Sequence, residues 1–284
     1  MNQSQSAGFT LVELAIIIVI IGLVAAGLLV GKDLIKAAEL RAQVAQIQEI
    51  ETATQTFMNK YGGLPGDILA SEAEGYGMEY RDGEEGNGDG DKYIETCDVS
   101  SYAEFGCEAA LFWRDLSYAQ LISGRFDKAV GDYIVVTEDQ LDQYFPKAKI
   151  GQNNYISVFS DVPLADSSIG CYRNELCFGM RQIKSTSAPF GQFVSEDKGI
   201  TPFDAFSLDK KIDDGSSGTG RMVGGDYMPS FDEQERNGMR VYHGENTAFW
   251  DADRCNIRGA NGVVNYDVAP PRGEIPSCAI NFNF

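Results

Sequence analysis

The sequence contains very few of the residues and motifs on which common catalytic sites depend. It has one histidine, His243, and its six cysteines include no CxxC pair, so the ligand spacing of a zinc site is absent. There is no GxSxG nucleophile elbow, Walker loop or dinucleotide-binding fingerprint. Carboxylates are so abundant that no particular pair points to a glycosidase. We therefore expect neither an enzyme nor an organic cofactor.

Basic residues are also scarce. Lysine and arginine together number 23 against 42 aspartates and glutamates, which gives a formal net charge of −19 at pH 7. A protein that binds nucleic acid gains affinity by neutralising phosphates with cations. This charge balance makes nucleic acid an unsuitable partner.

The clearest feature is a long apolar run near the N-terminus. Residues 14–30 read LAIIIVIIGLVAAGLLV, and with residues 9–12 they reach the roughly 20 residues that a helix needs to cross about 30 Å of hydrocarbon. A secretory signal peptide has a shorter apolar core and a basic start. An ordinary membrane anchor explains the length but not Glu13, because a carboxylate in such a run costs about 2.5–3.5 kcal/mol unless it is paired.

The residues around Glu13 resemble the processing site of type IV prepilins and of the pseudopilins of type II secretion. The matching stretch is GFTLVE, residues 8–13. The resemblance implies that prepilin peptidase cleaves between Gly8 and Phe9 and methylates the new amine of Phe9. It also implies that Glu13 pairs with the Phe9 ammonium of a neighbouring subunit, which would offset the cost of both charges.

This resemblance leads to a prediction of function. We expect a structural subunit, minor or specialised, of a type IV pilus or type II secretion pseudopilus. Its partners would be prepilin peptidase, other pilin or pseudopilin subunits and the inner-membrane assembly platform. It would cross the inner membrane once, with a periplasmic C-terminal head, and later enter the filament. The alternative is a membrane-tethered periplasmic binding module, adhesin or enzyme that does not polymerise.

The chain after the apolar run predicts an α+β protein with a type IV pilin-like architecture. Apolar residues continue at three- and four-residue steps as far as Tyr61, and GGLPGD follows as a helix stop. We expect a leader at 1–8, a transmembrane helix at 9–31, its amphipathic continuation at 32–61 and a globular head at 62–284. Within the head we expect a loop at 71–96, a helix at 103–123 capped by Gly124, and short strands at 133–137, 155–159, 191–194 and 263–266.

The cysteines suggest disulfides in an oxidising compartment. The basic residues Lys32, Lys36 and Arg41 follow the apolar run and would alone favour a cytoplasmic head, whereas disulfides favour a periplasmic one. Six cysteines allow fifteen pairings. We expect the pairs of sequence neighbours, because each closes a short loop: Cys97–Cys107, Cys171–Cys177 and Cys255–Cys278.

An acidic, glycine-rich loop suggests a calcium site. Residues 84–91 read EEGNGDGD, and Glu85, Asn87, Asp89 and Asp91 offer oxygen ligands of the kind that calcium prefers. The fit to an EF-hand fails at Thr96, where a bidentate glutamate would be needed. Two interpretations stay open, a solvated acidic loop and a weak calcium site formed by these four residues.

Overall fold

The fold was analysed in a computed structural model. The structure describes residues 10–78, 88–94, 108–128, 137–151, 153–160, 176–182, 185–187, 192–194, 199–217, 219–225, 255–258, 264–266, 268 and 278–283.

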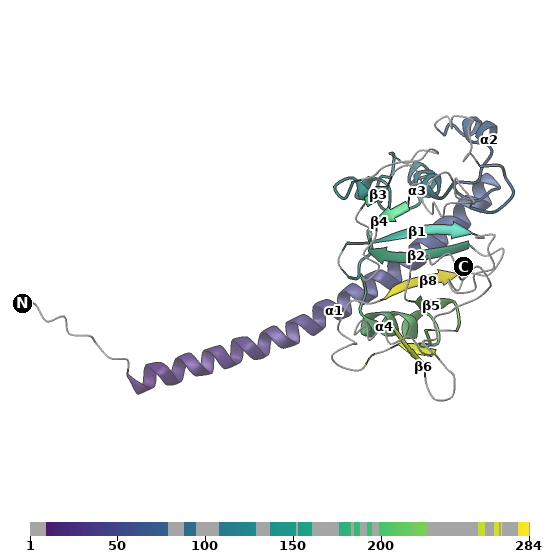
Figure 1. The fold of residues 1–284 in the computed structure, drawn as a ribbon. Helices are drawn as coiled ribbons and strands as arrows, with labels where there is room; N and C mark the ends of the chain where they lie inside the picture. Colours follow the sequence, from purple (N-terminus) through teal and green to yellow (C-terminus); the bar gives the residue numbers. More distant parts are fainter. Residues whose placement is uncertain are drawn as a thin grey trace, which may run out of the picture.

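One helix, α1 (Leu11–Tyr61), dominates the molecule and extends far beyond the head (Figure 1). Thr10 caps it, and its first residue, Leu11, lies two residues after the predicted start. It ends where the sequence predicts, because Gly62 takes a left-handed conformation (φ 84°) and donates its N–H to the carbonyl of Met58. At 1.5 Å per residue, its 51 residues span about 76 Å.

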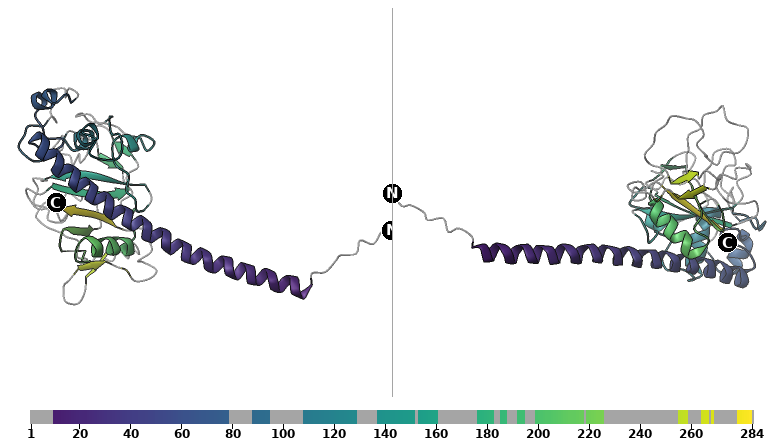
Figure 2. Two further views of the ribbon diagram at one scale, coloured as in Figure 1. Left: turned by 180° about the vertical axis from the view of Figure 1, so that it is seen from behind. Right: turned by 90° about the horizontal axis from the view of Figure 1, so that it is seen from below.

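The two ends of α1 have different surroundings. From Leu11 to Ile35 its large apolar side chains are exposed. From Gln43 onward one face is buried against the head, and Figure 2 shows this part of α1 running across the sheet. The buried residues recur at helical spacing: Gln43, Gln46, Ile47, Ile50, Ala53, Thr54, Phe57 and Tyr61.

The head contains a four-stranded antiparallel sheet with the strand order β1-β2-β8-β5. The strands are β1 (Asn154–Ser160), β2 (Leu176–Gln182), β8 (Ala279–Asn283) and β5 (Met222–Gly225). Two small antiparallel pairs accompany it, β3 (Ser185–Ser187) with β4 (Gln192–Val194) and β6 (Asn256–Arg258) with β7 (Val264–Tyr266). The predicted strands at 155–159, 191–194 and 263–266 correspond to β1, β4 and β7 within the described residues, whereas residues 133–136 lie outside them.

A row of apolar side chains crosses this sheet and forms the centre of the head core. Val158, Phe178, Phe282 and Met222 occupy matching positions on the four strands, and all are buried. The rings of Phe178 and Phe282 stack with centroids 5.5 Å apart. This row joins strands from distant parts of the chain into one sheet.

Helix α3 (Glu108–Tyr118) covers part of the core and is shorter than the predicted helix at 103–123. Gln120 ends it by adopting a left-handed conformation (φ 56°), and the N–H of Leu121 returns to the carbonyl of Leu116. Gly124 is therefore not the cap, and residues 103–107 lie outside the described part of the chain. Trp113 is fully buried, and its ring lies 6.0 Å from that of Phe178.

The remaining helices are short. Within the predicted loop at 71–96, α2 (Ala70–Gly75) forms a helix that the sequence did not predict. A 3₁₀ turn, η1, occupies Leu141–Gln143. Helix α4 (Pro202–Ile212) packs against α1, β5 and β7. Its start is well specified, because Thr201 accepts the N–H of Asp204 and Pro202 occupies the first turn.

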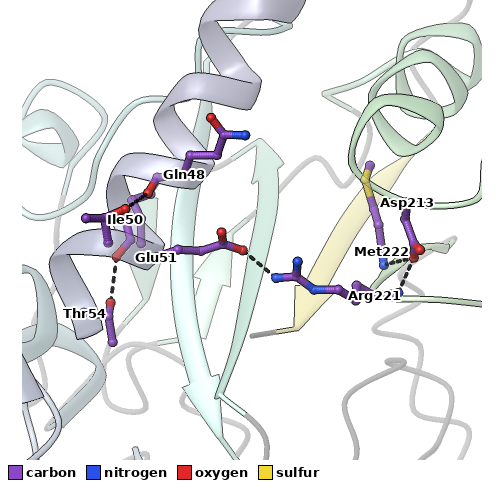
Figure 3. Close-up of polar contacts among 8 residues, drawn as sticks. Gln48, Ile50, Glu51, Thr54, Asp213, Arg221 and Met222 are labelled. Carbon is purple, nitrogen blue, oxygen red and sulfur yellow. Dashed lines mark hydrogen bonds and ion pairs between the residues drawn. The ribbon is translucent and has the colours of Figure 1, made fainter. Parts of the chain in front are cut away.

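Polar contacts fix the rotation of the head about α1. Gln46 donates its Nε2–H to the carbonyl of Lys147 at 2.9 Å, and Gln43 Oε1 accepts the N–H of Lys149 at 2.7 Å. On another side, Arg221 forms an ion pair with Glu51 at 2.5 Å (Figure 3). Backbone N–H groups of Arg221 and Met222 donate to Asp213, which holds the arginine segment in place.

Candidate assembly segment

The N-terminal end of α1 is closed by a reciprocal pair of polar contacts between Thr10 and Glu13. Glu13 Oε2 accepts both the N–H and the hydroxyl of Thr10, each at 2.8 Å, while the N–H of Glu13 donates to Thr10 Oγ1 at 3.3 Å. This is a capping box, in which two groups satisfy each other's unpaired backbone donors. Glu13 therefore has a role within its own helix.

The helix that follows Glu13 is long and apolar enough to cross a membrane, by length and composition. Its most apolar 18-residue window has no buried residue in the isolated chain. Soluble helices hide their apolar side chains against a core, and this segment has no such cover within the described structure. Its side chains need lipid or other helices around them.

The same segment matches a family model for the prokaryotic N-terminal methylation motif, at residues 3–29. It is a prepilin-type cleavage and methylation segment. Comparisons with curated proteins and with solved structures gave no match for the chain.

The prepilin-type segment supports a precursor similar to type IV pilins and pseudopilins. Proteins with such segments are membrane-anchored and generally structural rather than enzymatic, and the exposed apolar half of α1 agrees with an anchor. The two residues at the predicted cleavage point, Gly8 and Phe9, lie outside the described residues. The pairing of Glu13 with a neighbour's Phe9 remains a prediction.

The predicted calcium loop lies partly outside the described residues, which include Asp89 and Asp91 but neither Glu85 nor Asn87. Asp89 is close to two acids that the sequence analysis did not single out. Carboxylate oxygens of Asp67, Asp89 and Glu108 all lie within 4.8 Å of one another. Asp91 instead accepts the N–H of Tyr93 at 2.8 Å. The calcium site remains a prediction.

Asp67 organises this acidic region. It is fully buried, and its two oxygens accept the N–H groups of Gly90 and Lys92, each at 2.8 Å. Burial raises the pKa of Asp67 to about 6, although these two donors oppose the rise. Gly88 passes so close to the backbone of Asp67 that a side chain would collide with it. Asp67 thus ties the acidic loop to the end of α1.

A second acidic group consists of Asp209, Asp213 and Asp214, whose carboxylates also lie within 4.8 Å of one another. Donors within the protein occupy all three. Asp209 accepts from Gly215 N–H at 2.9 Å and Tyr266 hydroxyl at 3.0 Å, and Asp213 accepts the backbone donors described above. Asp214 accepts from Ser216 N–H and Thr219 hydroxyl, each at 2.7 Å. These hydrogen bonds close the end of α4.

The structure contains a disulfide between Cys255 and Cys278, one of the three expected pairs. Cys177, buried in β2, is also disulfide-bonded. Cys97, Cys107 and Cys171 lie outside the described residues, so the pairs Cys97–Cys107 and Cys171–Cys177 remain predictions.

Sequence reasoning missed the contribution of Asp67 and Glu108 because neither lies in the glycine-rich loop. Asp67 belongs to the helix stop GGLPGD and Glu108 begins α3, and only the tertiary fold brings them to Asp89. A local signal exists for Asp67 alone, because an aspartate after Gly66 in a turn commonly accepts backbone N–H groups.

Proposed function

We propose that the chain is a structural subunit, minor or specialised, of a type IV pilus or a type II secretion pseudopilus. In this proposal it is cleaved after Gly8, methylated on Phe9 and polymerised by bundling its apolar helices. The head, residues 62–284, is large enough to suggest a specialised rather than a bulk subunit. It would face the periplasm and then the outside of the filament.

The observation that supports this proposal best is that the cleavage and methylation motif at residues 3–29 coincides with a helix whose apolar side chains are exposed. The large apolar side chains from Leu11 to Ile35 are exposed in the isolated chain. Moving such a helix from lipid to a bundle of like helices changes its hydrophobic free energy little, since both surroundings are apolar. Packing and specific polar pairs must then determine the register of the subunits.

Glu13 is the residue that can supply such a pair. Its Oε2 is occupied by Thr10, whereas its Oε1 has no hydrogen-bond partner within the described part of the chain. An ammonium group from a neighbouring subunit could approach Oε1 without breaking the capping box. Pairing would offset the cost of an acid in apolar surroundings.

The test is to follow processing and filament entry separately for Glu13→Gln and Glu13→Ala. Glutamine keeps a capping acceptor at this position but removes the charge, whereas alanine removes both. We expect prepilin peptidase to process both variants and neither to enter sheared filaments. Glu39→Gln, at an exposed position of α1, should assemble like the wild type.

One outcome would contradict the charge pair, and another would contradict the proposed function. Normal filament entry of Glu13→Gln, with failure of Glu13→Ala, would assign Glu13 to helix capping and remove the charge pair. If the wild-type chain is processed but never found in filaments, it is a membrane-tethered periplasmic binding module, adhesin or enzyme instead.

A further inference from the structure

The first turn of α4 contacts α1 at Lys36, the residue that follows the last exposed apolar side chain of α1. Lys36 Nζ forms an ion pair with Asp204 Oδ1 at 3.0 Å and lies 5.0 Å from the centre of the Phe203 ring. Ile35, one residue earlier on α1, is still 62% exposed. Figures 1 and 2 show α4 beside the point where α1 leaves the head.

The position of Lys36 along the helix gives its height above a membrane. If residues 11–30 cross the hydrocarbon, they account for about 30 Å, and Lys36 lies six residues, or about 9 Å, further along the axis. The polar headgroup layer adds roughly 5–8 Å on each side of the hydrocarbon. Lys36 and the first turn of α4 therefore lie at the outer edge of the headgroups.

Phe203 is unusual for this position because it is 47% exposed on a helix whose other face is packed in the head. Phenylalanine occurs, with tryptophan and leucine, on the apolar face of helices that lie at the boundary between lipid and water. Lysine side chains can extend from apolar surroundings toward the headgroups. The charge of Asp204, only 14% exposed, is matched by Lys36. The acid that follows Phe203 in the sequence is thus paired, in a protein of net charge −19.

We propose that the first turn of α4, led by Phe203, rests on the phospholipid surface while the subunit is in the membrane. The inference rests on the proposed function only in requiring that α1 spans the bilayer. Lys36 joins the membrane helix and this contact, so the head lies against the bilayer at a fixed tilt. Extraction of the subunit would remove Phe203 from the lipid together with α1.

The experiment places single tryptophans in the full chain in nanodiscs and quenches them with phospholipids brominated along the acyl chain. Phe203→Trp reports the proposed contact and Leu23→Trp, in the exposed apolar part of α1, reports insertion. Tyr76→Trp is the matched control. Tyr76 is also 47% exposed, but its hydroxyl donates to the carbonyl of Tyr61, about 37 Å beyond Lys36 along α1. Subtraction of the wild-type signal removes the native tryptophans.

We expect strong quenching at position 23 by deeply placed bromines, quenching at 203 by bromines near the headgroups, and no quenching at 76. Quenching at 23 with equal, weak signals at 203 and 76 would overturn the lipid contact and leave the proposed function standing. The same result, with a blue shift of the tryptophan introduced by Phe203→Trp only in filaments, would assign Phe203 to a contact between subunits, which also overturns it. Absence of quenching at 23 would contradict both proposals.

Discussion

The two ends of α1 differ in what stabilises them, although they form one uninterrupted helix. The end from Gln43 to Tyr61 lies in the head core, where Phe57 is fully buried and its ring lies 4.5 Å from that of Tyr61. The end from Leu11 to Ile35 exposes its apolar side chains. Burial of apolar surface provides most of the free energy of folding. The head therefore contains its own stabilising contacts, whereas the exposed end depends on its surroundings.

This difference teaches that similar apolar residues on one helix can stabilise two separate processes, folding of the head and burial of the exposed end in lipid or among other helices. Ile47 and Ile50 contribute when the head folds, because they are already covered. Ile18 and Ile21 are more than half exposed and contribute only when lipid or a neighbouring helix covers them. Substitutions at the two ends should consequently affect different measurements.

The largest contrast is expected between Phe57→Ala and Leu28→Ala in the full chain in detergent micelles. Phe57→Ala should lower the free energy of unfolding of the head by about 3–5 kcal/mol, because it leaves a cavity in the core. Leu28→Ala should change it by less than about 0.5 kcal/mol. Urea denaturation followed by fluorescence of the buried Trp113 measures the free energy of unfolding of both variants. Equal losses would contradict the difference between the two ends of α1.

The next effect concerns the Cys255–Cys278 disulfide, which belongs only to the head. Replacing both cysteines by serine opens a loop with a sequence separation of 23 and should cost about 2–4 kcal/mol. The same urea denaturation measures the loss. Insertion of α1 into micelles, followed by Leu23→Trp fluorescence, should not change. A loss of insertion would show that the exposed end depends on the folded head.

A pH effect is expected from Asp209, whose pKa is raised to about 6, mainly by burial. Its pKa in the unfolded chain is about 3.9, so the native state binds the proton more tightly. Its contribution to stability is present below that unfolded value and is lost as the pH rises through about 6. The melting temperature of Asp209→Asn should therefore fall less than that of the wild type between pH 4 and 6.5. Asp33→Asn, at an exposed position on α1, should keep the wild-type slope.

A smaller effect is expected from the ion pair that joins α1 to the head. The Arg221 and Glu51 side chains are 51% and 28% exposed, and pairs of this kind contribute about 0–1 kcal/mol. Arg221→Ala should lower stability within that range. Arg125→Ala removes a more exposed arginine paired with Asp127, only two residues away, and is the matched control. A cost well above 1 kcal/mol for Arg221 alone would mean that this ion pair determines how the head attaches.

The smallest effect is expected from calcium, which should act on the head only. Calorimetry on the full chain should detect weak binding, with a dissociation constant on the order of 10⁻⁴–10⁻³ M, as in extracellular calcium modules. Asp89→Ala should abolish the heat, while Asp33→Ala should keep it. Equal heats in wild type and Asp89→Ala, or no heat in either, would favour the solvated loop.

The sequence predicted those parts of the fold that depend on neighbouring residues. The end of α1 at Tyr61 follows from the glycines after it, and β1 follows from the β-branched and aromatic residues around Tyr155. The sequence did not predict that β2, β8 and β5 would join β1 in one sheet, because such pairing depends on contacts between distant segments. The end of α3 was misplaced because Gln120 adopts the left-handed conformation usually taken by glycine.

The candidate assembly segment was more predictable than the head, because a membrane helix is identified by composition and a processing site by a short motif. The capping role of Glu13 follows from Thr10 three residues earlier, a spacing that the sequence displays. The contact between Lys36 and the first turn of α4 joins residues more than 160 positions apart, and no local pattern predicts it.

The hydrogen bonds from Gln43 and Gln46 to the head have a mechanical consequence. Together with the buried face of α1, they hold the head in one orientation about the helix axis. The unbroken helix therefore transmits rotation as well as axial force to the head. A neighbouring subunit that binds α1 near Glu13 therefore determines the position of the head along the helix axis and its rotation about that axis, although the head lies about 50 Å away. A packing slip of one residue would raise the head by about 1.5 Å and rotate it by about 100°.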